Sequence, residues 1–207
     1  MTTRLRGLTG ATLPSAPTVC HSCVWWQSRP GKRTAKGRWI EKAEGDWGAW
    51  GTLYVDDDGR VLGSMQYGPS DLFPRAEELP AGPASDDAVL ITCAYLVEGS
   101  AQWVMQSLFL AAIADSRERG GRALEAFAYR YGEGESTEQR FLVHRTVFPS
   151  DFLADFGFRT VRRQGRVELA RLELGGLQPV AEKFRPRLVR RVAELLEPEP
   201  APVPRRP

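Results

Sequence analysis

Residues 88–97 read AVLITCAYLV, an uninterrupted apolar run. Its length and its β-branched content are typical of a strand that is buried on both faces. Residues 100–119 then place apolar side chains at helical spacing, and Gly120 with Gly121 provides a stop for that helix. A second apolar segment, residues 123–129, predicts another strand. The order of strand, helix and strand predicts two adjacent parallel strands joined by a crossover helix.

The chain before this unit predicts an antiparallel hairpin. Gly51–Val55 and Val61–Tyr67 are two apolar segments, and Asp58 and Gly59 between them tolerate the positive φ that tight hairpin turns require. We also expect a first short strand or an extended arm within Leu5–Leu13. Together these segments predict an antiparallel part of the sheet next to the parallel pair.

Residues 69–87 separate the hairpin from the central strand. They are rich in Pro, Gly and acidic residues, which predicts an excursion over the surface. Pro74 is suited to open one helical turn there, because its fixed φ matches the first position of a helix.

The chain after the central unit predicts a short helix and a final pair of strands. The helix is expected at Phe152–Phe156, with Ser150 or Asp151 near its N-cap. The strands are expected at Phe158–Arg163 and Arg166–Leu174. The whole pattern is that of an α/β protein.

Length and charge narrow the class of protein. The chain has 207 residues and a formal net charge of +2. This length fits one domain with its own core, and the balanced charge argues against bulk attraction to nucleic acid or to a membrane. We expect a domain over residues 1–176, an amphipathic helix at 177–197 and a disordered Pro-rich tail at 198–207.

Targeting signals and cysteine usage indicate the compartment. No segment approaches the roughly 20 apolar residues of a membrane helix, and residues 1–17 lack the apolar run of a secretion signal. Three cysteines in a chain of this length do not suggest a disulfide scaffold. We therefore expect a cytoplasmic protein with reduced thiols.

Residues 19–50 combine tryptophans with basic residues. They hold five of the six tryptophans and six of the lysines and arginines. We expect one or two irregular helices with a break at Pro30 and Gly31. The tryptophans either pack in a core and wall a pocket, or stack on nucleic-acid bases while Arg29–Lys42 contacts phosphates. The near-neutral charge of the chain favours the core and the pocket wall.

Residues 20–23 read CHSC, a C-x-x-C pair. A zinc site needs about four nitrogen or sulfur ligands, and the chain offers only Cys93 and His144 besides this pair. No metal is therefore expected, and no thioredoxin pattern surrounds the motif. We interpret the pair as ordinary thiols on a helix beside Trp25 and Trp26.

The order of elements over roughly residues 50–174 resembles the core of the GNAT superfamily of acyl-CoA-dependent N-acyltransferases. The most specific match is FLADFGF at residues 152–158, running into Arg159–Val161. It resembles the short helix, Gly-Phe pair and strand that close many GNAT domains. The segment VLGS at residues 61–64 resembles the family's second hairpin strand. The resemblance implies a mixed, centrally splayed β-sheet flanked by helices.

The resemblance also implies a place for acetyl-CoA as co-substrate. In GNAT proteins the fourth and fifth strands splay apart around the acyl-CoA, the fourth strand's backbone holds the pantetheine arm, and the pyrophosphate rests on the next helix N-terminus. We expect the pocket between the end of residues 88–97 and the start of residues 123–129. The implied cofactor-binding residues are Ala94, Leu96, Val97, Gly99, Ser100, Ala101, Gln102 and Trp103.

Three side chains are candidates for the chemistry. Tyr95 shares a strand face with Cys93 and Val97 and is placed to protonate a leaving thiolate, whereas the alternative for a strand tyrosine is simple core packing. His144 is a candidate general base, because a histidine side chain can accept a proton near neutral pH. In the GNAT frame, Glu98 would flank the amine and the thioester.

Two functions are compatible with this sequence. The first is transfer of an acetyl group from acetyl-CoA to an unidentified primary amine on a small molecule or a protein. The alternative is a catalytically inactive GNAT-fold binding or regulatory protein. The alternative is favoured by Trp103 and Met105, which replace glycines of the family pattern, and by Leu153, which replaces a tyrosine. A homodimer is left open.

A chain shortened at Glu197 should fold like the full chain, because the Pro-rich residues beyond it offer little to a core. Thermal unfolding of both forms checks this. A melting temperature several degrees lower for the shortened chain would show that the tail packs on the domain.

Overall fold

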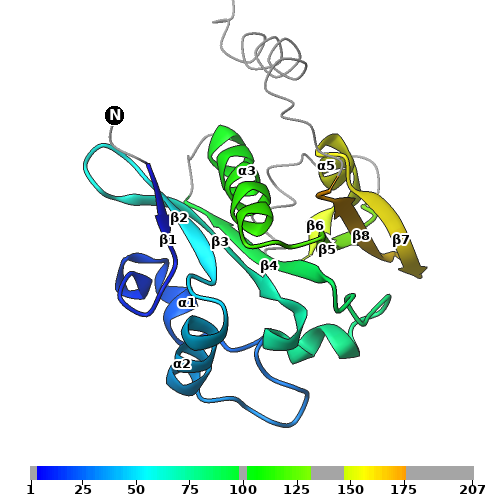
Figure 1. Cartoon of the computed structure of the whole chain (residues 1–207), viewed down its shortest axis with the longest axis horizontal. Coiled ribbons are helices and arrows are strands. Elements are labelled where there is room, and N and C mark those ends of the chain that lie inside the picture. The colour runs from blue at the N-terminus through cyan, green and yellow to red at the C-terminus, as the bar shows by residue number, and fades with distance from the viewer. Residues whose placement is uncertain (1–3, 98–101, 132–146, 176–207) are drawn as a thin grey trace, which may run out of the picture. The chain divides into compact units, whose positions relative to one another are not determined.

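The computed structural model describes residues 4–97, 102–131 and 147–175 (Figure 1). These residues belong to one unit, Met1–Gly175. The expected helix at 177–197 and the expected tail at 198–207 lie outside the described residues. None of the described helices is both long enough and apolar enough to cross a membrane.

The elements follow the order that the sequence predicted, with three additions. The helices and 3-10 turns are η1 Leu13–Ser15, α1 Thr18–Ser22, α2 Lys36–Asp46, η2 Ser70–Leu72, η3 Pro74–Glu78, α3 Gln102–Glu118 and α5 Ser150–Asp155. The strands are β1 Leu5–Gly7, β2 Gly51–Val55, β3 Val61–Pro69, β4 Ala88–Leu96, β5 Ala123–Tyr129, β6 Phe148–Pro149, β7 Arg159–Gln164 and β8 Val167–Glu173. The strand β6 and the turns η1 and η2 were not predicted.

One mixed sheet carries these strands in the order β1-β2-β3-β4-β5-β8-β7, with β6 paired to β5 off this path. β4 and β5 are parallel, and α3 is the crossover between them, as predicted. The flanking pairs β3–β4 and β5–β8 are antiparallel. The prediction of an α/β fold with a mixed β-sheet flanked by helices is therefore confirmed.

The parallel pair is held together only at its beginning. Pairing runs from Ala88 with Ala123 to Ile91 with Ala126, although both strands continue beyond. At the same level β4 carries an extra residue, because Gln66 of β3 pairs with Cys93 while the next residue pairs with Ile91. The extra residue is Thr92, and such a bulge bends and twists its strand. β4 and β5 therefore splay apart toward their C-terminal ends.

Helices cover both faces of the sheet. α3 and α5 lie on one face, and α1 and α2 lie on the other (Figure 1). The core on the α1 and α2 face is built from aromatic and aliphatic side chains of distant segments, among them Trp26, Trp39, Trp50, Leu90 and Phe127. The prediction that most tryptophans of residues 19–50 are core residues is confirmed.

Glycines end elements where the backbone turns left-handed. Gly120 has φ 77°, and the amides of Gly120 and Gly121 donate to the last carbonyls of α3. In the β2–β3 turn only Gly59 has positive φ, at 80°. Asp58 does not, so the expectation of a turn with two positive φ angles was wrong. The amide of Gly59 donates to Asp56, which makes a turn followed by a left-handed glycine.

One further expectation was wrong. Residues 69–87 are not a surface excursion, because Leu72, Phe73 and Ala81 are at most 2% exposed and belong to the core. The apolar side chains spaced along η2 and η3 draw this Pro-rich stretch inward. α5 begins at Ser150, two residues earlier than expected, and its N-cap is the adjacent Pro149.

A polar network anchors α3 to the hairpin. The hydroxyl of Tyr67 donates to Asp115 of α3 at 3.0 Å and lies 2.6 Å from the hydroxyl of Thr52. Arg119 donates to the same carboxylate at 2.8 Å. Burial of Tyr67 raises the pKa of its phenol well above the usual value, so it stays a donor at neutral pH.

A charged clamp, formed by Arg171, Asp87 and Glu125, joins β4, β5 and β8 at the end where β4 and β5 are paired. Arg171 of β8 contacts Asp87, just before β4, at 2.9 Å and Glu125 of β5 at 3.1 Å. Glu125 is fully buried and also accepts from the amide and hydroxyl of Ser85. The hydrogen bond from Arg171 holds the pKa of Asp87 below its usual value.

Replacing Arg171 with methionine should lower the free energy of unfolding by about 3–5 kcal/mol, because Glu125 would stay buried without its cation. Chemical denaturation measures the loss. The control is Arg159→Met on β7, where the side chain is exposed and the change should stay within about 0.5 kcal/mol. Similar losses in the two variants would contradict the clamp.

Candidate functional site

The second half of β4 points backbone N–H and C=O groups toward the side of the strand where its pairing with β5 has ended. The amide of Val97 donates to Leu62 of β3 at 2.9 Å. Because amides and carbonyls alternate along a strand, those of Tyr95 also point toward β3. The backbone N–H and C=O of Ala94 and Leu96 then point away from β3, toward β5. No strand of the described residues pairs with that edge of β4 beyond Ile91.

The short strand β6 lies on the facing edge of β5. β8 pairs along one edge of β5 from Ala123 to Tyr129, so the parallel pairing of β6 with Ala128 and Tyr129 uses the edge that faces β4. Phe148 of β6 packs against Phe109 of α3 with ring centroids 5.4 Å apart. The edge of β4 at Ala94 and Leu96 therefore faces β6 rather than β5.

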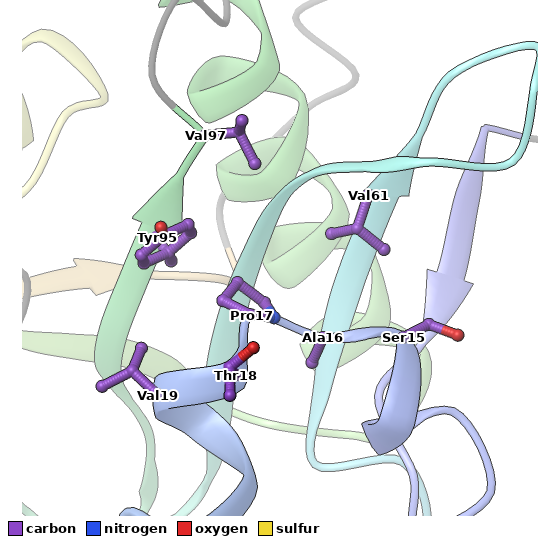
Figure 2. A pocket seen from close by; sticks show the side chains of 8 residues that line it. All are labelled: Ser15, Ala16, Pro17, Thr18, Val19, Val61, Tyr95 and Val97. Atoms are coloured by element: carbon purple, nitrogen blue, oxygen red, sulfur yellow. The ribbon is translucent and has the colours of Figure 1, made fainter.

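An open pocket of about 390 Å³ lies beside the same end of β4, on the α1 face. β4 and the segment after it contribute Tyr95 and Val97, β3 contributes Val61, and residues 15–19 form the opposite wall (Figure 2). The described lining is Ser15, Ala16, Pro17, Thr18, Val19, Val61, Tyr95 and Val97. This lining carries small and neutral side chains, with the Tyr95 phenol as its ionisable group.

The structure brings some of the predicted site residues together. Tyr95 and Val97 line the pocket from one strand face, as alternation predicted. The backbone groups of Ala94 and Leu96 point to the edge of β4 that lies away from β3, as described above. Gln102 is the first residue of α3. Glu98, Gly99, Ser100, Ala101 and His144 lie outside the described residues.

Trp103 packs toward the hairpin. Its ring meets Tyr54 of β2 edge-to-face with centroids 5.0 Å apart, and the side chain is 38% exposed. β2 lies on the far side of β3 from β5, so the indole does not fill the space between β4 and β5. The sequence left the direction of this ring open, and the structure resolves it.

The predicted position of the gap was wrong in one respect. We placed it against the start of residues 123–129, but that part of β5 is the part that pairs with β4. Two parallel strands have their C-terminal ends side by side, so the splay lies at the end of β5. The pocket wall at residues 15–19 was also missed, because this stretch shows no periodicity and reaches β4 only through the fold.

Three of the six basic residues within residues 19–50 have partners in the same domain. Arg29 pairs with Glu77 at 2.8 Å, and Lys42 pairs with Asp46 at 2.8 Å. Lys36 lies over the rings of Trp39 and Trp50 at about 5 Å. These contacts hold the three charges against neighbouring elements of the same domain. They fit the interpretation in which the tryptophans form a core and the charges are solvated.

The three thiols converge on the α1 face. Cys93 interacts electrostatically with Cys20, Cys23 and Lys36, and its thiol lies 3.4 Å from Oε1 of Gln66. Burial raises the pKa of Cys93 to about 12. Burial also lowers the pKa of Lys36. Within residues 4–97, 102–131 and 147–175, no group of three or more Cys, His, Asp and Glu side chains is arranged to hold a metal ion.

No protein-family model and no curated protein sequence matches the chain. Similar solved structures include the PaiA N-acetyltransferase of Thermoplasma acidophilum in complex with coenzyme A, which is 12% identical over 84% of this chain and 99% of its own, with a TM-score of 0.46.

Two others are a GCN5-related N-acetyltransferase from Kribbella flavida and Ard1 from Thermoplasma volcanium. The first is 16% identical over 82% of this chain and 96% of its own, with a TM-score of 0.46. The second is 10% identical over 84% and 97%, with a TM-score of 0.47. At these values the likeness says nothing about substrate or cofactor.

Replacing Trp103 with alanine should destabilise the domain by about 0.5–1.5 kcal/mol beyond the loss of buried area, because the edge-to-face pair with Tyr54 is lost. Leu110→Ala is the control, since Leu110 is 55% exposed on the same helix. Chemical denaturation compares the two. Equal losses would show that the aromatic pair does not anchor the start of α3.

The elements that the GNAT resemblance implied are all present: an antiparallel hairpin, a long central strand, a crossover helix, a parallel strand, a short helix and a final strand pair. The sheet splays where the resemblance implied, between the fourth and fifth strands. The fold of this chain is GNAT-like.

Proposed function

We propose that the chain transfers an acetyl group from acetyl-CoA to a primary amine. The observation that carries this proposal is the edge of β4 with which no strand of the described residues pairs beyond Ile91. Ala94 and Leu96 present N–H and C=O groups to the side where β5 has diverged, and these groups need partners. The alternating amides and carbonyls of a pantetheine arm match such an edge as an added strand would.

The pocket at Tyr95 and Val97 is the proposed acceptor side. It lies on the α1 face of the same strand whose free edge would hold the pantetheine arm. An amine entering there approaches a thioester held at the edge. The wall formed by residues 15–19 is contributed by the segment that leads into α1, in keeping with a pocket walled by the first helices.

Tyr95 is the proposed proton donor. The amine nitrogen attacks the thioester carbon, the C–N bond forms and the C–S bond breaks, and the departing sulfur takes a proton. A phenol on the strand that holds the thioester is placed to supply that proton. The amine loses a proton to water or to a base, for which His144 remains the sequence-based candidate.

The lining of the pocket favours a neutral group next to the amine. Within the described residues, the lining has no Asp or Glu to attract a polycation, and no Lys or Arg to hold a carboxylate. Val19 and Val97 are 55% and 37% exposed at its rim and offer apolar contact. We therefore expect a primary amine attached to an uncharged, partly apolar group.

A catalytically inactive binding module is the second candidate. Met105, which replaces a glycine of the family pattern, is 1% exposed in α3, so the start of this helix is packed rather than open. This observation favours a helix terminus with less room for the backbone to approach a pyrophosphate. A protein that binds acetyl-CoA without turnover would belong to this class.

Calorimetric titration with acetyl-CoA, followed by an assay of thiol release with a panel of primary amines, tests the proposal. Wild type should bind, and Tyr95→Phe should bind equally while kcat falls by roughly 10²-fold or more. Tyr54→Phe is the control, because Tyr54 lies on β2 beside Trp103 and outside the pocket.

Three results are decisive in this experiment. Binding with turnover that depends on Tyr95 supports the transferase and the role of the phenol. Binding without turnover by any amine supports the inactive module. Failure of wild type to bind acetyl-CoA at millimolar concentration contradicts both the cofactor and the placement of the site on β4.

A further inference from the structure

The C-x-x-C pair lies next to the proposed acceptor pocket. Cys20 is in α1, and Cys23 is the residue at which that helix ends. Thr18 and Val19 of the same five-residue helix line the pocket. None of the cysteines forms a disulfide in the structure. A covalent change at this pair would therefore act on a wall of the pocket.

The spacing of Cys20 and Cys23 suits a disulfide. Side chains three residues apart on a helix have Cβ atoms roughly 5–6 Å apart, slightly more than the roughly 3.5–4.5 Å of a disulfide. Cys23 has left the helix, with ψ 126°, and it is exposed. Formation of the bond therefore requires a rotation at this helix end, which belongs to the wall of the pocket.

The surroundings give the three thiols different roles. Cys93 on β4 is half-buried, and its thiol donates to Oε1 of Gln66 at 3.4 Å. Cys23 is exposed, so a small oxidant in solvent can reach it. The Lys36 ammonium donates to the carbonyl oxygen of Cys23 at 3.0 Å, which places positive charge beside the backbone of this residue.

We propose that Cys20 and Cys23 form a reversible dithiol–disulfide pair that is oxidised by hydroperoxides and that reshapes the α1 wall of the pocket, with Cys93 remaining a thiol. The oxidation is independent of acetyl transfer. Its effect on turnover rests on the proposed function.

The chemistry balances with hydrogen peroxide as the oxidant. The sulfur of one cysteine attacks a peroxide oxygen, the O–O bond breaks, and a sulfenic acid and water result after proton transfer. The second sulfur attacks the sulfenic sulfur, the S–S bond forms, and a second water leaves. Two thiols lose one electron each, and hydrogen peroxide gains two. A dithiol reductant reverses the process by exchange.

The test is peroxide treatment of the purified full chain, followed by thiol counting and peptide mapping under non-reducing conditions. Wild type should fall from three reactive thiols to one when counted unfolded, with Cys20 linked to Cys23. Dithiothreitol should restore all three. Cys93→Ser should form the same bond and fall from two thiols to none, whereas Cys20→Ser and Cys23→Ser should form no intramolecular disulfide.

Any of three results would overturn the proposal: no loss of thiols, a disulfide that includes Cys93, or linkage between chains as the main product. Cys93→Ser guards against misfolding as an explanation, because it leaves the C-x-x-C pair intact. If the disulfide forms in a protein that transfers no acetyl group, the proposed redox pair is supported and the proposed function is contradicted. If the reduced enzyme is active, oxidation should change its KM for the amine, and an unchanged KM would overturn the reshaping of the pocket.

Discussion

The structure depends on where the pairing of β4 with β5 stops. Hydrogen bonding joins them from Ala88 with Ala123 only as far as Ile91 with Ala126, and the bulge at Thr92 follows at once. Beyond this point β3 is the strand that pairs with β4 among the described residues. The edge that results offers the backbone of Ala94 and Leu96, and the face above it offers Tyr95 and Val97. A cofactor site and an acceptor site can therefore share one strand.

The two ends of this strand pair are stabilised differently. At the paired end, Arg171 joins Asp87 and the buried Glu125, so β4, β5 and β8 are tied by charge as well as by the ladder. Near this end as well, Tyr67 and Arg119 bind Asp115 in the last turn of α3. At the splayed end, no strand of the described residues pairs with the β5 side of β4 beyond Ile91. A rigid paired end allows the other end to remain open without loss of the fold.

The sequence predicts the central unit because its signals are local. The apolar run at residues 88–97, the helical spacing after it and the strand at 123–129 each follow from a periodicity that the chain shows by itself. The bulge at Thr92, the strand β6 and the burial of Phe73 depend on contacts across the fold, and no local pattern announces them. The same holds for the approach of Cys93 to Cys20 and Cys23, which lie some seventy residues away in the sequence.

The candidate site likewise has a part that the sequence predicted and a part that it did not. Alternation along the strand predicted that Tyr95 and Val97 share a face, and the resemblance to GNAT proteins placed Ala94 and Leu96 at the splay. The neutral wall at residues 15–19 could not be predicted, because residues so distant in sequence meet β4 only after the sheet and α1 have formed.

Amide hydrogen exchange, followed residue by residue by NMR with and without CoA, tests the central claim most directly. If β4 holds the pantetheine arm by its free edge, exchange at Ala94 or Leu96 should slow markedly on binding, while Tyr95, already bonded toward β3, should change little. Unchanged exchange at both Ala94 and Leu96 in a protein saturated with CoA would contradict the account.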